Sequence, residues 1–262
     1  MPWIIRGLSN GVLTTKYPKT MDSYGSAWNG TVTVRPGSSS LDEQDLEEIC
    51  PTSAIRVAPG GPRIDLGKCV LCGRCVERAA ELFSFSSSFE TARLSRDLLE
   101  APQISGGTEE LAALKRALAS RVRAFGNSVA VRHIDCGSDG SEEWEIAALT
   151  NPVYDVQRLG ITFTASPRHA DILLVTGANA KGMSESLKET YLQMAEPKVV
   201  VAVGTDAISG GLHQGSPAIV EGGIDAILPV DVFVPGSPPS PFGVLYGILL
   251  AMGAALDRGR SI

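Results

Sequence analysis

The chain has 262 residues, of which 44% are hydrophobic and 20% charged, proportions that are ordinary for a folded soluble protein with one large domain or two small ones. Its formal net charge of -6 argues against nucleic-acid binding by the chain as a whole. No apolar run approaches the ~20 residues that a membrane span requires, and the opening residues lack the long apolar run of a signal peptide.

The cysteines are concentrated in one short region. Four of the five fall between Cys50 and Cys75. A secreted disulfide framework would distribute them more evenly along the chain. Their clustering therefore favours a reducing compartment and a metal site.

The first 37 residues are expected to form an irregular docking arm. The stretch "WIIRGLSNGVLTTKYPK" mixes apolar residues with Arg6, Lys16 and Lys19, and it is interrupted by glycines and a proline. Two interpretations stay open. The arm either lies on the surface without a partner, or it docks on a partner or a membrane surface.

Residues 38–100 are expected to form a small domain. Within "SSSLDEQDLEEICP", Ser40 is a candidate N-cap for a helix whose first turn is acidic. The segment that follows is short and rich in Gly and Pro, which suits a domain held by a cluster instead of a large core. Residues 101–126 form a linker, in which "APQISGGT" marks the domain boundary and Glu109 to Phe125 show helical periodicity.

From residue 127 to 262 the pattern changes to alternating strands and helices. Short β-rich runs, "VAVRHI", "ITFTA", "DILLVTG", "KVVVAVG" and "VDVFVPG", are separated by the helical segments "SEEWEIAAL" and "SESLKETYLQMA". This alternation predicts a parallel sheet covered on both faces, with the functional loops at the carboxyl ends of its strands. The apolar segment "VLYGILLAMGAAL" predicts a helix buried beneath a partner subunit.

Three cysteines have the spacing of an iron–sulfur ligand run. Cys69, Cys72 and Cys75 lie in "DLGKCVLCGRCVERAAELF", but the fourth position of the run is Ala79. In two-cluster ferredoxins the fourth cysteine of each run ligates the cluster of the other run and precedes a proline. Cys50, followed by Pro51, satisfies this rule. The spacing therefore predicts one [4Fe–4S] cluster on Cys50, Cys69, Cys72 and Cys75.

The ligands of a second cluster are all missing. They would occupy Ser40, Glu43, Leu46 and Ala79. One complete set is thus retained and the other removed. The alternative is a zinc site on the same four thiolates, although zinc usually takes two Cys-x-x-Cys pairs.

Longer motifs resemble two known subunits. "RGLSNGVLTTKYP", "CPTSAI", "DLGKCVLCGRCVE" and "FETARLSRDLL" resemble the ferredoxin-like subunit of complex I and of group 4 membrane-bound nickel–iron hydrogenases, the formate hydrogenlyase type. "VRHIDCGS", "EIAALTNPVYDVQRLGI", "SPRHADILLVTG", "PKVVVAVGTDAISGG" and "LPVDVFVPGSPPSP" resemble their small, quinone-proximal subunit. The expected fold is an α+β ferredoxin-like iron–sulfur module followed by an α/β three-layer, flavodoxin-like parallel-sheet domain.

The resemblance fails at the cluster of the second subunit. The family holds that cluster with four cysteines, whose positions here are Asp139, Glu142, Asp206 and Ser237. Carboxylates and a hydroxyl are poor ligands for iron–sulfur clusters, so no cluster is expected in this domain. The three carboxylates are expected to be solvated or paired. A divalent-cation or proton-storage site is the other interpretation, because neighbouring carboxylates raise one another's pKa.

The resemblance implies an electron-transfer subunit of the peripheral arm of a membrane-bound complex. It would lie on the cytoplasmic face of the cell membrane, beside a hydrogenase-large-subunit-like or quinone-module subunit and antiporter-like membrane subunits. No residue is expected to be catalytic by itself. Two alternatives are a structural scaffold whose cluster is not part of an electron relay, and a soluble stand-alone ferredoxin.

Overall fold

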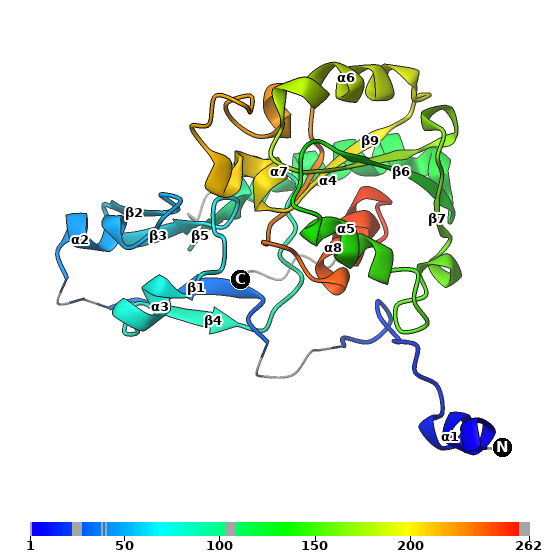
Figure 1. The fold of residues 1–262 in the computed structure, drawn as a ribbon, viewed down its shortest axis with the longest axis horizontal. Coiled ribbons are helices and arrows are strands. Elements are labelled where there is room, and N and C mark those ends of the chain that lie inside the picture. The colour runs from blue at the N-terminus through cyan, green and yellow to red at the C-terminus, as the bar shows by residue number, and fades with distance from the viewer. Residues whose placement is uncertain (1, 23–27, 38, 40, 103–107, 257–262) are drawn as a thin grey trace.

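A computed structural model describes residues 2–22, 28–37, 39, 41–102 and 108–256. Its centre is a five-stranded sheet in which all neighbouring strands are parallel (Figure 1). In spatial order the strands are β10 (Val232–Val234), β9 (Val199–Val203), β8 (Ile172–Thr176), β6 (Val129–Asp135) and β7 (Ile161–Phe163). The predicted parallel sheet is therefore confirmed.

The order of these strands fixes where the sheet offers a crevice. The chain forms β6 first, adds β7 on one side of it, and then returns to add β8, β9 and β10 on the other side. This is the order of flavodoxin-type doubly wound sheets. The connections change direction between β6 and β8, so the loops at the carboxyl ends of these two strands flank the usual binding crevice of such folds.

Alternate residues of each strand enter two different cores. On β9, Val199, Val201 and Val203 face one core, while Val200 and Ala202 face the other. The first core is covered by α4 (Thr108–Val122), α5 (Ser141–Ala148) and α8 (Pro241–Ala251). The second is covered by α6 (Ser184–Gln193) and α7 (Thr205–Ser209), and Figure 1 shows α6 on the opposite side of the sheet from α5 and α8.

Helix α8 is buried along its whole length by the chain itself. Every residue from Pro241 to Ala251 is buried, against the valines of β9 and β10 and against Phe89 and Val122. The prediction that a partner subunit covers this helix was therefore wrong. Its apolar surface on all sides follows from its position inside the first core. Of the described helices, none has the length and apolarity that crossing a bilayer demands.

The front part of the chain consists of two small antiparallel sheets. One pairs β1 (Thr31–Val34) with β4 (Phe83–Ser86), and the other has the order β2-β3-β5. The remaining elements of this part are β2 (Ile55–Ala58), β3 (Gly61–Asp65), β5 (Glu100–Ala101), α2 (Glu43–Glu48) and α3 (Arg74–Arg78).

The front part packs directly on the large sheet. Val32 and Phe83 belong to the same buried core as Val175 and Ile208. Arg93 also exchanges two backbone hydrogen bonds with Phe233 of β10, at 2.9 and 2.8 Å, which pairs the exposed edge of the sheet. The two parts therefore share one continuous apolar core.

Two expectations for the beginning of the chain were wrong. Residues 2–10 form a helix, α1 (Pro2–Asn10), and residues 31–34 form β1, although the first 37 residues were expected to be irregular. Helix α2 is capped by Asp42, whose carboxylate accepts from the N–H of Asp45, while Ser40 lies outside the described residues. Short 3-10 turns occur at Arg96–Leu99, Arg123–Phe125, Val156–Leu159, Pro167–His169, Lys181–Met183, Gly211–His213 and Ile224–Ala226.

Candidate metal centre

Four cysteines line one pocket in the front part of the chain. Cys50 follows α2, Cys69 and Cys72 lie in the loop between β3 and α3, and Cys75 lies in α3. All four thiols are free. The other lining residues are mostly apolar and come from β1, β2, β3, the start of α3 and the neighbouring loops: Val32, Ile49, Ile55, Ile64, Val70, Gly73 and Arg74. The structure thus places all four predicted ligands around one pocket.

The loop between β3 and α3 is shaped by two left-handed residues. Leu71 has φ 53° and Gly73 has φ 79°, and Gly73 directly precedes α3. Backbone N–H groups of Leu71 and Val76 bond the thiols of Cys69 and Cys75. The N–H of Ala54 also donates to Cys50 Sγ at 3.2 Å. Such N–H···S bonds favour thiolate over thiol, so the pocket supplies donors for anionic sulfur.

Burial disfavours the ionised form of two pocket thiols. Burial raises the pKa of the Cys69 thiol to about 12 and that of Cys75 to about 11. The charges of the neighbouring pocket cysteines raise both pKa values further. Positive charge in the pocket would remove this repulsion and allow the thiols to ionise.

Two of the four positions of the missing second ligand set are used for packing. Ala79 is fully buried and Leu46 is 5% exposed, and both belong to the core of the front part. Glu43 is exposed at the start of α2, and Ser40 lies outside the described residues. Within the described parts of the chain, no three His, Cys, Asp or Glu side chains are close enough together to hold a metal ion.

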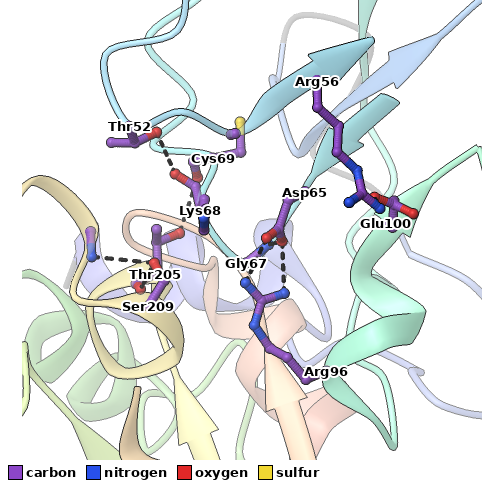
Figure 2. Close-up of polar contacts among 12 residues, drawn as sticks. Thr52, Arg56, Asp65, Gly67, Lys68, Cys69, Arg96, Glu100, Thr205 and Ser209 are labelled. Carbon is purple, nitrogen blue, oxygen red and sulfur yellow. Dashed lines mark hydrogen bonds and ion pairs between the residues drawn. The ribbon is translucent and has the colours of Figure 1, made fainter. Parts of the chain in front are cut away.

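A buried hydrogen bond joins the cysteine pocket to the large sheet. The hydroxyl of Thr205, the first residue of α7, donates to the carbonyl oxygen of Cys69 at 3.0 Å (Figure 2). Thr205 itself is fully buried, and its N–H donates to Gly236 at 2.7 Å. Residues from three distant parts of the chain therefore fix the backbone at a predicted ligand.

The segment before Cys69 is held by an ion pair. Arg96 makes two hydrogen bonds to the carboxylate of Asp65, at 2.7 and 2.6 Å, and Figure 2 shows the pair beside Gly67. A methyl group on Gly67 would come within 2.7 Å of Ile208 and 2.8 Å of the Arg96 guanidinium. The close approach of α7 to this loop therefore requires glycine at position 67.

The four positions where the resembled family has cysteines lie at the carboxyl edge of the large sheet. Glu142 is in the first turn of α5, Asp206 is in α7, and Ser237 is in the loop between β10 and α8. Glu142 is 1% exposed, and a methyl group on Gly204 would overlap its carboxylate. Its side chain thus lies against the turn that leads to Asp206.

Ser141 links two of the carboxyl groups. Its hydroxyl lies 2.6 Å from Asp139 Oδ1 and 3.0 Å from Glu142 Oε2. A hydroxyl has one proton and can donate to only one of them. Both contacts are satisfied when Glu142 is protonated, because its carboxyl then donates to Ser141 while Ser141 donates to Asp139.

The pKa values of these groups agree with that arrangement. Burial raises the pKa of Glu142 to about 7, although hydrogen bonds from its own backbone N–H and from Ser141 oppose the shift. Asp206 and Asp139 add smaller upward contributions. Burial also raises the pKa of Asp206. Hydrogen bonds from Ser141 lower the pKa of Asp139, which is exposed. The alternative interpretation, in which the three carboxylates raise one another's pKa, therefore fails at Asp139.

Three residues at these sites were missed by the sequence analysis. Ser141 connects Asp139 with Glu142, Thr205 holds Cys69, and His213 lies close enough to lower the pKa of both aspartates. The fifth cysteine, Cys136, is buried, and burial raises its thiol pKa to about 12. It does not line the pocket of the other four. Thr205 could not be found from spacing, because only folding brings it near Cys69, 136 residues away. Ser141 lies beside Glu142 and two residues from Asp139, but no motif marks its hydroxyl.

Comparisons with known proteins concern mainly the second half of the chain. The model of the family "NADH ubiquinone oxidoreductase, 20 Kd subunit" matches residues 139–251. A probable membrane-bound hydrogenase subunit, mbhJ, from Pyrococcus furiosus is 41% identical over 139 residues, which are 53% of this chain and 83% of the relative. Formate hydrogenlyase subunit 7 from Escherichia coli is 39% identical over 145 residues, 55% of each chain, so about half of that relative is matched.

A solved structure of the membrane-bound sulfane sulfur reductase, described as an archaeal respiratory membrane complex, contains a chain that is 29% identical. The match covers 53% of this chain and 76% of that one, with a TM-score of 0.45. The family match includes the four altered positions, and the two hydrogenase relatives confirm the resemblance of the second half to hydrogenase small subunits. Given the extent of the match to the Pyrococcus relative, the chain belongs to the family of the 20 kDa subunit of NADH ubiquinone oxidoreductase.

Proposed function

We propose that the chain is an iron–sulfur electron-transfer subunit in the peripheral arm of a membrane-bound complex related to complex I and group 4 hydrogenases. Its first part is a ferredoxin-like module with one [4Fe–4S] cluster on Cys50, Cys69, Cys72 and Cys75. Its second part docks a hydrogenase-large-subunit-like or quinone-module subunit, and antiporter-like subunits complete the complex in the cytoplasmic membrane. The observation that carries the proposal is the pocket lined by all four cysteines.

The donor set of the pocket fits an iron–sulfur cluster. Thiolates are the usual ligands of such clusters, and a cluster of this kind carries one electron at a time. The lining is mostly apolar, while the N–H groups of Ala54, Leu71 and Val76 supply hydrogen bonds to sulfur. The alternative, one zinc ion on the same four thiolates, would need all four sulfurs at ~2.3 Å from one point.

The second candidate is a scaffold whose cluster only braces the fold. It is favoured by the four altered positions, where an exposed aspartate, a buried glutamate, a half-buried aspartate and a serine replace the family's thiolates. These side chains provide no ligand set for another cluster. The onward route to a nickel–iron or quinone site would then lack its last centre.

A redox titration of the assembled complex distinguishes the two candidates. The complex is purified with the full chain, and the iron–sulfur signal is followed by electron paramagnetic resonance at controlled potentials. Electron transfer predicts reversible cycling and reoxidation of the cluster when an acceptor of the complex is added. A cluster that stays in one state throughout supports the scaffold, and zinc in place of iron contradicts both.

Thr205 offers a test of the connection between the two parts. Thr205→Val removes the hydroxyl but keeps the shape, which leaves the Cys69 carbonyl buried without this donor and costs about 1–3 kcal/mol of unfolding free energy. Urea denaturation measures the loss, and a shift in the midpoint potential of the cluster reports the altered ligand position.

Thr205→Ser keeps the hydroxyl donor. It is expected to restore most of the free energy of unfolding and of the midpoint potential of the cluster. Thr190→Val is the matched control, because its exposed hydroxyl bonds only the Ser186 carbonyl within α6. If Thr205→Val leaves both the stability and the potential at wild-type values, the hydrogen bond has no positioning role.

A further inference from the structure

Helix α1 is the most exposed apolar element of the described chain. It lies apart from the body of the molecule, at the end of an extended segment (Figure 1). The exposed fractions of its large side chains are 72% for Trp3, 39% for Ile4, 69% for Ile5 and 80% for Leu8. Val12 and Leu13, just beyond the helix, are exposed by 89% and 61%. A cluster of this kind marks an interaction surface.

The helix has two chemically different sides. Ile4 and Leu8 are four residues apart and lie on the same side, flanked by Trp3 and Ile5. Arg6 is two residues from both Ile4 and Leu8, which places it on the opposite side. An apolar side with a tryptophan at its edge and a basic opposite side are typical of helices that lie in a membrane interface.

The charge of this region differs from that of the rest of the protein. Residues 1–21 contain three basic residues, Arg6, Lys16 and Lys19, and no acidic residue. The rest of the chain carries 20 basic against 29 acidic residues. Lys16 and Lys19 are exposed. A positive segment on a negative protein is attracted to an anionic surface, while the remainder of the chain is repelled from it.

The base of this arm is attached firmly to the body. Thr15 donates its N–H to Val153 at 2.8 Å, and the carbonyl of Tyr17 accepts from Arg158 at 2.7 Å. The Tyr17 ring is fully buried and contacts Phe89 and Phe242, with centroid distances of 5.3 and 5.8 Å. The arm therefore has a fixed root, beyond which the apolar side chains are exposed.

We propose that α1 and residues 11–13 lie in the surface of an anionic lipid bilayer, with Trp3, Ile4, Ile5 and Leu8 among the acyl chains. The basic side chains Arg6, Lys16 and Lys19 contact the lipid phosphates. The charge pattern favours lipid over a protein groove, because all charges of the segment have one sign and match a uniformly anionic surface. This inference rests on the proposed function, which places the chain at a membrane, and it assigns α1 and residues 11–13 as the surface that contacts the lipid.

Vesicle sedimentation with the purified full chain tests the proposal. Phosphatidylcholine vesicles with about 30% phosphatidylglycerol are expected to bind the chain at least about tenfold more tightly than pure phosphatidylcholine vesicles. Leu8→Glu is expected to weaken binding about tenfold or more, because it places a charge within the apolar side. Arg6→Gln is expected to weaken it about fivefold, the effect of one lost surface charge.

The matched control is Leu192→Glu, which changes a 65% exposed leucine on α6 and is expected to leave binding unchanged. Equal loss of binding in Leu8→Glu and Leu192→Glu, equal binding to both lipid mixtures, or binding only when other subunits are present overturns lipid docking. Iron content is measured on the same preparations without lipid. An intact cluster without vesicle binding therefore rejects this inference and leaves electron transfer standing, while missing iron rejects the proposed function separately.

Discussion

Cys72→Ala is expected to reduce the iron content from about four atoms per chain to about three or fewer and to abolish the reduced-state signal of a [4Fe–4S] cluster. Cys72 is exposed, so its sulfur contributes little to packing. The loss of iron would therefore come from the loss of a ligand and not from unfolding. Iron analysis and electron paramagnetic resonance measure the effect, while circular dichroism checks that the fold is retained.

Cys136→Ala is the control, because it removes a buried cysteine that is not a predicted ligand. Cys136 is 1% exposed, lies outside the pocket and contributes to the core. This variant is expected to lose some stability but to keep all of its iron. If cysteine removal lowered the iron content only by disturbing the fold, Cys136→Ala would lose more iron than Cys72→Ala, because Cys136 is the buried residue. Full iron in Cys72→Ala, or about eight iron atoms in the wild-type chain, would contradict the single four-cysteine cluster.

Glu142→Gln is expected to stabilise the protein at pH 8 by up to about 3 kcal/mol and to have little effect near pH 4. The pKa of Glu142 is raised from 4.5 to about 7, mainly by burial. Between these values the folded chain holds a proton that the unfolded chain has released. The free energy of unfolding of the wild-type protein therefore falls as pH rises through this window, and the loss is complete above about pH 7.

Urea denaturation from pH 4 to pH 8 measures this dependence. The glutamine keeps the shape of a protonated glutamate and can still bond Ser141. In Glu142→Gln the free energy of unfolding is therefore expected to lose the part of its pH dependence that comes from titration of Glu142. Asp139→Asn is the control, because the pKa of Asp139 is lowered and its carboxylate stabilises the fold above its usual titration range. This variant is expected to destabilise the protein at pH 8. A parallel pH dependence in wild type and Glu142→Gln would refute the raised pKa.

Cysteine spacing and strand composition are local properties, and they predicted much of this protein. The four pocket cysteines could be identified because three of them have the fixed spacing of a ligand run. The fourth, Cys50, could be identified because the last cysteine of one run ligates the cluster of the other run. The strands of the large sheet could be identified because strands buried on both faces are continuous β-branched runs, such as Val199–Val203. Helix α4 was visible in its apolar periodicity.

The sequence alone therefore identified the four pocket cysteines, the parallel sheet and the residues that stand where the resembled family has cysteines, Asp139, Glu142, Asp206 and Ser237. Tertiary structure decided that Glu142 is buried while Asp139 is exposed, that Thr205 holds Cys69, and that α8 is covered by the chain itself. The spacing of ligands and of apolar residues is a property of neighbouring residues in the sequence. Burial and long-range hydrogen bonds depend on residues that are distant in the chain and meet only when it folds.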